Sequence, residues 1–198
     1  MTSRDAHREA TRAKIARTAE RLFRERGYKA TTIRDIAAAA GVSVGSVMTL
    51  GDKRALLVAM FDRYIAEVHQ ERARQNQSTT PGGAGTSTAD SLIELVRPFL
   101  EIFSTQSDLA REYAAALVSG AHSSVIFKDL EAALITEIES ALAKEGMPPA
   151  SVPGAARTIY LSYLGSLFEW AGGSGADISK PLRNLRLVLN FVTESKEA

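Results

Sequence analysis

Apolar residues recur at helical rather than strand spacing along almost the whole chain. Between residues 7 and 26, for example, Ile15, Ala19, Leu22 and Phe23 fall on one face of a helix. No stretch alternates apolar and polar residues long enough to predict a strand. Later helices are expected at about 90–104, 108–120, 124–145, 153–171 and 179–194. The pattern therefore predicts an all-α protein of about nine helices.

The first third of the chain carries clear signals for helix ends. Gly27 ends the first helix, because glycine adopts the left-handed conformation without steric cost. Thr32 followed by Asp35 is a capping-box-like start for the helix "IRDIAAAA", which ends at Gly41. These signals predict one long helix followed by a short one.

A second short helix follows directly. Ser43 can cap a helix over about 44–50, and Asp52 can cap a long fourth helix over about 53–75. Two short helices separated by a brief turn that contains glycine form a helix-turn-helix, here over about residues 31–50. Small residues Ala37 and Ala38 allow the two helices to cross closely, and Val42 and Val47 are placed to pack against Ile36.

Composition changes after the fourth helix. The segment "NQSTTPGGAGTSTAD", residues 76–90, is polar and glycine-rich and is expected to be a flexible loop. Pro98 lies inside the next helix and is expected to kink or restart it. We expect two domains, a helix-turn-helix domain over 1–52 and a second helical domain over 53–198.

The net charge of +1 conceals an asymmetry. Residues 1–60 hold twelve Lys and Arg against six Asp and Glu, a net of +6, whereas the remainder holds twelve against seventeen, a net of −5. A basic third on an acidic body favours binding of a polyanion at the N-terminal end, and a solvated charged face is the alternative.

The outward face of the helix-turn-helix suggests which polyanion. A helix that enters the major groove benefits from small side chains, while hydroxyls and a lysine can contact phosphates. An ordinary helical hairpin in a core is the alternative interpretation. The partner predicted is double-stranded DNA, contacted by Thr32, Ser43, Val44, Gly45, Ser46, Met48, Thr49 and Lys53.

Three motifs within residues 10–65 also resemble the N-terminal domain of the TetR family of bacterial transcriptional regulators. They are "A-x-x-L-F-x-x-x-G-Y-x-x-T-T", "I-x-x-I-A-x-x-A-G-V-S-x-G-S" and "K-x-x-L-L". The resemblance implies a homodimeric regulator, more often a repressor, which releases its operator when a small molecule binds. It also implies that the later helices form a ligand-binding and dimerisation domain.

One segment departs from the family pattern. The family usually has an aromatic, any residue, an aromatic and Phe before the serine and lysine, whereas this chain has "VMTLGDK", one residue shorter and without an aromatic. The tyrosine that typically donates to a phosphate corresponds to Met48, which cannot donate. The anchoring role of the Phe passes to Leu50.

The last two predicted helices are apolar on more than one face, which indicates burial on two sides. Two such helices from each of two chains would form a four-helix interface with two-fold symmetry, and the core of a monomer is the alternative. The interface residues expected are Leu161, Leu164, Phe168, Leu182, Leu185, Val188, Leu189 and Val192.

A small-molecule pocket between the later helices is expected to be apolar with a few polar groups. For each residue taken singly, ordinary core packing is the alternative. The candidate lining residues are Tyr64, Phe99, Phe103, Tyr113, His122, Tyr160, Tyr163 and Trp170.

Several function classes find no support in the sequence. The chain has no cysteine, and its three histidines are scattered, so we expect no metal, no cofactor and no enzyme activity. No apolar run approaches about 20 residues and the N-terminus has no signal core, which predicts a cytoplasmic protein without a membrane partner. A ligand-sensing or protein-binding helical dimer with weakened or lost DNA binding remains the alternative function.

Overall fold

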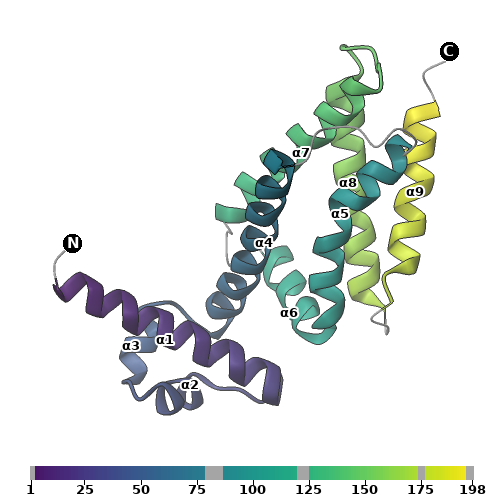
Figure 1. Cartoon of the computed structure of the whole chain (residues 1–198). Helices are drawn as coiled ribbons and strands as arrows, with labels where there is room; N and C mark the ends of the chain where they lie inside the picture. The colour runs from purple at the N-terminus through teal and green to yellow at the C-terminus, as the bar shows by residue number, and fades with distance from the viewer. Residues whose placement is uncertain (1–2, 79–86, 120–124, 174–176, 195–198) are drawn as a thin grey trace. The chain divides into compact units, whose positions relative to one another are not determined.

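The computed structural model describes residues 3–78, 87–119, 125–173 and 177–194. Those residues form nine α-helices and no strand, as the hydrophobic pattern predicts (Figure 1). The helices are α1 (Ser3–Arg26), α2 (Ile33–Ala40), α3 (Val44–Met48), α4 (Lys53–Ser78), α5 (Thr88–Thr105), α6 (Ser107–Val118), α7 (Val125–Lys144), α8 (Val152–Gly172) and α9 (Ser179–Glu194).

The helices form two compact units, and the boundary between them lies inside α4. The first unit contains the residues up to Tyr64 together with α6 from Asp108 onward, and the second begins at Ile65. A division at residue 52 therefore does not follow the packing. The reason is that the first turns of α4 bury Leu57 and Phe61 completely in the core of the first unit.

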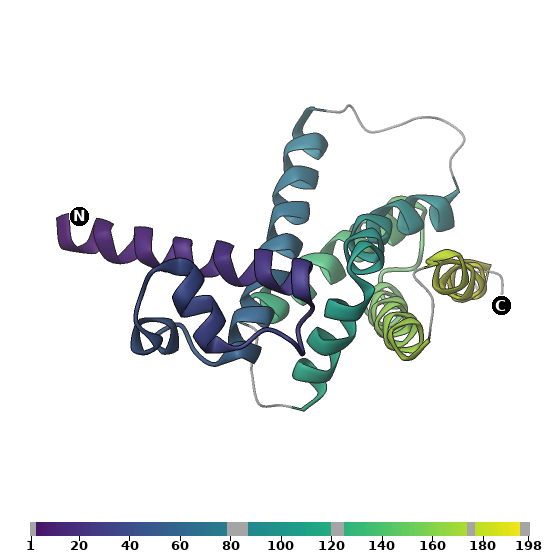
Figure 2. The same ribbon diagram turned by 90° about the horizontal axis from the view of Figure 1, so that it is seen from below.

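In the first unit, α1 packs on α2, and α2 packs on α3 (Figure 2). The shared core includes Ile15, Leu22 and Phe23 of α1, all at most 1% exposed. Helix α6 joins this unit through Tyr113, whose ring stacks on Phe61 with 4.7 Å between centroids. The sequence pattern did not predict this membership, because α6 is remote from α1–α4 in the chain.

In the second unit, α8 packs against α7 and α9, and α9 also packs against α5 (Figure 1). Leu142, Leu185 and Leu189 are at most 1% exposed and lie in this core. Ion pairs add to the packing at the surface, with 2.6 Å between Lys180 Nζ and Glu169 Oε1. Among the helices described, none is long and apolar enough to cross a membrane.

Some helix boundaries differ from the expected ones. Helix α1 begins at Ser3 rather than residue 7, and α3 ends at Met48 rather than residue 50. The expected loop over 76–90 is shorter at both ends, since α4 continues to Ser78 and the Ser87 side chain accepts a hydrogen bond from the Asp90 amide at 3.1 Å, capping α5. Its centre, 79–86, lies outside the described residues.

Pro98 does not restart α5, which runs as one helix from Thr88 to Thr105.

Candidate functional site

The turn into α2 is held by a reciprocal capping box. Asp35 N donates to Thr32 Oγ1 at 3.2 Å, while Asp35 Oδ2 accepts from Thr32 N at 2.8 Å and from Thr32 Oγ1 at 2.6 Å. The hydrogen bonds from the Thr32 side chain and backbone lower the pKa of Asp35. Gly41 ends α2 with φ at 62°, as its position predicts. The entrance and exit of α2 are thus fixed by local contacts.

Helix α3 is pinned to α2 by one side chain. Val47 and Ile36 are both fully buried, whereas Val42 is only partly buried. Of the two alanines expected at the crossing, Ala37 is buried but Ala38 is exposed, and Ala40 occupies the buried position instead. Ala38 lies one residue beyond Ala37, which turns it about 100° away from the contact.

Next to the buried Val47, α3 has an exposed apolar strip. Val44 is 43% and Met48 is 50% exposed. They are the only exposed large apolar side chains in the described residues before Tyr64. Gly45 and Thr49 are also exposed and, being four residues apart, form the adjacent strip, which lies opposite Val47. Within residues 3–64, the exposed large apolar side chains therefore lie on the second helix of the helix-turn-helix, and Val118 on α6 is the other one described in the first unit.

The hydroxyls at α3 are engaged within the protein. Ser43 Oγ accepts from Ser46 N at 3.1 Å and lies 2.9 Å from Ser46 Oγ. Thr49 Oγ1 donates to the backbone oxygen of Ser46 at 2.7 Å. These bonds fix the ends of a helix of only five residues.

The shortened segment after α3 is accommodated by a tight turn centred on Gly51. Its N–H donates to the Met48 carbonyl at 3.1 Å, and its φ is 119°. A Cβ at this position would lie 2.5 Å from the Ala55 Cβ, so only glycine fits. Asp52 Oδ1 then accepts from Ala55 N at 2.8 Å and caps α4 as expected. Sequence reasoning overlooked Gly51, although its position in "LGD" marks a turn.

Lys53 is directed at the loop between α1 and α2. Its Nζ donates to the Tyr28 carbonyl at 2.9 Å and lies 4.2 Å from the centroid of the Tyr28 ring. Burial raises the pKa of Tyr28, so the phenol stays neutral near pH 7. The lysine expected to contact a phosphate therefore has an internal partner in this structure.

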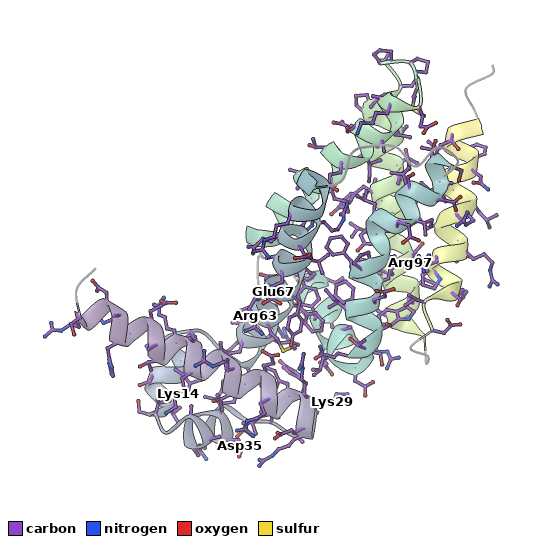
Figure 3. All side chains as sticks on the ribbon, in the orientation of Figure 1. Lys14, Lys29, Asp35, Arg63, Glu67 and Arg97 are labelled. Carbon is purple, nitrogen blue, oxygen red and sulfur yellow. The ribbon has the colours of Figure 1, made fainter. Side chains whose placement is uncertain are left out.

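The cations of α1 divide into two groups. Toward its C-terminal end, Arg21 pairs with Glu25 and Arg24 pairs with Glu20. Lys14, labelled in Figure 3, belongs to the other group, which forms no ion pair with a described carboxylate. The members of that group are Arg4, Arg8, Arg12, Lys14 and Arg17 in the first two thirds of the helix, and Arg26 at its end. Along the first two thirds of α1, these five cations stand against Asp5 and Glu9, a net charge of +3.

The second unit contains a small apolar cavity of about 50 Å³. Four of the expected pocket residues line it, namely Phe99, Phe103, Tyr160 and Tyr163. The lining residues that were not expected there are Ile65, His69, Glu131, Leu134, Leu164 and Leu167. Leu164 was expected at a dimer interface instead. The amphipathic pattern predicts that these side chains point into the core, but it does not predict that a cavity lies between them.

The other expected pocket residues lie elsewhere. Tyr64 belongs to the first unit, where its hydroxyl donates to Glu20 at 2.5 Å, and Tyr113 of the same unit donates to Asp62 at 3.2 Å. Trp170 is buried in α8 but does not line the cavity. His122 lies outside the described residues. Tyr64 and Tyr113 do not line the cavity because their side chains bond within the first unit.

The polar groups of the cavity are few. Burial raises the pKa of Tyr160 to about 12 and raises that of Tyr163 further, and neither hydroxyl bonds to a described residue. His69 packs against Phe99 with 4.8 Å between ring centroids, and burial lowers the pKa of its imidazole. At pH 7 the cavity therefore presents neutral phenols and a neutral imidazole, together with Glu131, whose carboxylate pairs with Arg157.

The expected dimer residues divide between the core and the surface. Leu185 and Leu189 are buried in the chain's own core and are not available to a partner, while Leu182, Val188 and Val192 are half-buried. Leu161 and Phe168 of α8 are exposed.

Two residues of α9 that sequence reasoning missed are more exposed, Leu187 at 66% and Phe191 at 74%. They follow Lys180 and Asn184 along one stripe of α9, and both of those residues contact Glu169, next to Phe168 on α8. The exposed apolar side chains therefore lie along the outer seam between α8 and α9.

No group of three or more metal-ligating side chains occurs within the described ranges.

The region that contains the helix-turn-helix matches known proteins. The family model described as "Bacterial regulatory proteins, tetR family" matches residues 15–60. The HTH-type transcriptional regulator TtgR of Pseudomonas putida is 40% identical over 68 residues, which cover 34% of this chain and 32% of TtgR. The chain thus matches only about a third of the length of this curated relative.

Solved structures resemble the chain over nearly its whole length. FadR of Thermus thermophilus, a TetR family transcriptional repressor solved in complex with lauroyl-CoA, has a TM-score of 0.68 at 25% identity and covers 94% of this chain and 95% of its own. BioQ, solved with its double-stranded DNA operator, has a TM-score of 0.59 at 19% identity over 91% of this chain and 96% of its own. The fold is that of TetR-family regulators, and the N-terminal helix-turn-helix domain of this chain belongs to the TetR family of bacterial regulatory proteins.

Proposed function

We propose that the chain is a homodimeric, ligand-responsive regulator that binds operator DNA in the cytoplasm and has no enzymatic activity. The observation that carries the proposal is the exposed face of α3, held by Val47 and by the capped turn, beside the unpaired cations of α1. An exposed second helix of this kind fits a major groove, and unpaired cations release counterions when they neutralise phosphates. The resemblance to operator-binding BioQ supports this assignment at the level of the fold.

The second part of the proposal concerns the effector. At about 50 Å³ the cavity of the second unit holds a water molecule or a methyl group, whereas small-molecule sites usually measure about 300–1,000 Å³. A ligand must therefore displace lining side chains as it enters. Its chemistry would be a largely apolar, uncharged body with one or two groups that bond to the phenols of Tyr160 and Tyr163.

Helix α4 supplies the connection between ligand and DNA. Ile65 and His69 line the cavity, and the same helix contributes Leu57 and Phe61 to the core of the first unit. A ligand that moves Ile65 or His69 therefore acts on the helix that carries the helix-turn-helix. It shifts the equilibrium toward the DNA-free state only by its preference for that state. We propose release, and thus repression in the absence of ligand.

The dimer is proposed to form along the seam of α8 and α9. Large apolar side chains are exposed there, namely Leu161, Phe168, Leu187 and Phe191. The proposed partner for this surface is a second copy of the chain related by two-fold symmetry. Two recognition helices would then read half-sites about 34–36 Å apart.

The experiment is fluorescence anisotropy of the purified full chain with DNA that flanks its own gene, against unrelated DNA, at about 50 and 200 mM salt. We expect preferential binding that weakens with salt, with a slope of log K near −0.9 per phosphate neutralised. Lys14→Ala should reduce the magnitude of that slope by about 1. The matched control is Lys180→Ala, which removes a lysine of α9 that pairs with Glu169 of α8, and it should leave the slope unchanged.

The alternative is a ligand-sensing or protein-binding dimer that has lost its operator. The internal engagement of Lys53 by Tyr28 is the observation in its favour. Absence of DNA binding at both salt concentrations would select this alternative over the regulator.

A further inference from the structure

The recognition helix lacks the side chains that usually identify bases. Arg, Lys, Asn, Gln, Asp and Glu read base edges by paired hydrogen bonds, and α3, "VGSVM", contains none of them. Its neighbours on the exposed side are Ser43 at the N-cap and Thr49 at the C-cap. Polar reading of sequence by α3 therefore depends on three hydroxyls.

Those hydroxyls have few hydrogens left to donate. The Thr49 hydroxyl hydrogen points to the Ser46 carbonyl, and one of the two serine hydrogens lies between Ser43 and Ser46. Ser43 Oγ also accepts the Ser46 amide hydrogen. A single serine hydrogen remains to donate to a base edge, and otherwise these hydroxyls can only accept from base amino groups.

The apolar side chains are, by contrast, fully presented. Val44 and Met48 are four residues apart, so they lie one above the other on an exposed strip of α3 that flanks the buried Val47. Gly45 lies beside Val44 and carries no side chain that would hold this face away from a partner. Elsewhere in the described residues before Tyr64, large apolar side chains are at least partly buried. Among residues 3–64 the exposed large apolar groups therefore lie on one short helix, which indicates an apolar target for that helix.

We propose that Val44 and Met48 read the 5-methyl groups of thymine in the major groove. Thymine alone among the four bases presents a methyl there, and apolar side chains are its natural contacts. Cytosine at the same place offers hydrogen in position 5 and an amino donor, for which these side chains provide no acceptor. Recognition thus selects thymine by burial of its methyl group. This inference rests on the proposed DNA-binding function and adds the chemistry of its specificity.

The test separates the methyl group from every hydrogen bond of the base. A preferred site is first selected from random-sequence double-stranded DNA with the full-length protein. Each thymine of that site is then replaced singly by deoxyuridine, which removes the 5-methyl and keeps the pairing and the groove hydrogen bonds. Burial of one methyl corresponds to about 0.8 kcal/mol, so each contacted thymine should weaken binding about fourfold when replaced.

Variants assign the effect to residues. In the native chain, replacing a contacted thymine by deoxyuridine should weaken binding about fourfold. In Met48→Ala this loss of affinity should disappear at one thymine, and in Val44→Ala it should disappear at a neighbouring thymine. Val118→Ala is the matched control, since Val118 is 71% exposed on α6, and it should leave every penalty unchanged. Circular dichroism of each variant confirms that it is folded, as is expected for exposed positions.

The outcomes distinguish the methyl readout from the DNA-binding function beneath it. A selected site whose affinity is unaffected by deoxyuridine at every thymine overturns the methyl readout and leaves the DNA-binding function standing. Penalties that persist in both Val44→Ala and Met48→Ala overturn the assignment to these residues. Failure to select any DNA overturns the proposed function and this inference together.

Discussion

Replacement of Gly45 by alanine should separate stability from DNA binding, because the two respond with opposite signs. A Cβ at Gly45 would meet only Ser43 Oγ, at 3.7 Å, which is an ordinary van der Waals distance. The folded chain therefore accepts the methyl without rearrangement. On the outward face, however, the same methyl lies where the backbone of α3 is proposed to approach the bases.

The stability gain follows from helix propensity. Alanine is favoured over glycine by about 1 kcal/mol in a helix interior. Gly45 is the second residue of a helix of five, so about half of that value is appropriate. A gain of roughly 0.5 kcal/mol should raise the melting temperature by about 1–2 °C in a chain of this size.

The DNA-binding loss follows from overpacking. An extra methyl at a close contact costs about 1–3 kcal/mol, which corresponds to about 5- to 150-fold weaker binding. Scanning calorimetry measures the first effect and fluorescence anisotropy with the selected DNA measures the second. Gly154→Ala is the control: Gly154 lies in the first turn of α8 with no atom within 4 Å of its Cβ position. It should gain similar stability without affecting DNA binding.

Two results would refute this reasoning. Gly45→Ala that binds DNA as tightly as the native chain would show that this face of α3 does not approach the bases. A fall in melting temperature would show that the methyl is not accepted at Gly45 without rearrangement.

Three further changes test other parts of the structure. Val47→Ala removes a fully buried contact between α2 and α3 and should lower the free energy of unfolding by roughly 2–3 kcal/mol, measured by urea denaturation; a loss near zero would contradict the pinning role. Because the folded pKa of Asp35 lies below its ordinary value of 3.8, its stabilising contribution is complete above that value and is lost as pH falls through the folded pKa. Asp35→Asn should thus be less stable than the native chain at pH 6 and nearly equal to it at the acid limit, and an equal gap at every pH in urea titrations would count against the capping box. Leu187→Glu places a charge on a side chain that is 66% exposed and should convert a dimer to monomer in sedimentation velocity, whereas unchanged mass would exclude the α8–α9 seam.

The sequence predicted those features that depend on neighbouring residues. The capping box of Thr32 and Asp35 and the glycine stop at Gly41 are formed within one turn of the chain, so the local residues suffice. The same holds for Asp52 at the start of α4. The fold class followed because helical periodicity persists through the chain.

Features that depend on distant segments were not predictable in this way. Tyr113 was assigned to a pocket because it is aromatic and inward, but its partner Phe61 is 52 positions away in the sequence. On α9, Leu185 and Leu187 are equally apolar, yet one is 1% and the other 66% exposed. A helix that is apolar on several sides does not reveal which side its own domain covers.

The same reasoning explains the mixed result for the cavity. Phe99 and Tyr163 were identified by residue type, while His69 and Glu131 were not, because their place among the lining residues depends on how α4 and α7 pack. The exposed residues of α3 were predicted better than the cavity lining. Val47 is the one buried side chain of this short helix, and it sets which side of the helix faces the core.

The placement of α6 in the first unit has a consequence for synthesis on the ribosome. Tyr64 and Val118 are separated by 54 residues, which take roughly 3–10 s to translate at about 5–20 residues per second. During that interval Phe61 has emerged but its stacking partner Tyr113 has not. The core of the first unit is thus completed only after all of α5 and part of α6 have been made. The DNA binding proposed above is therefore expected only of chains translated past Tyr113.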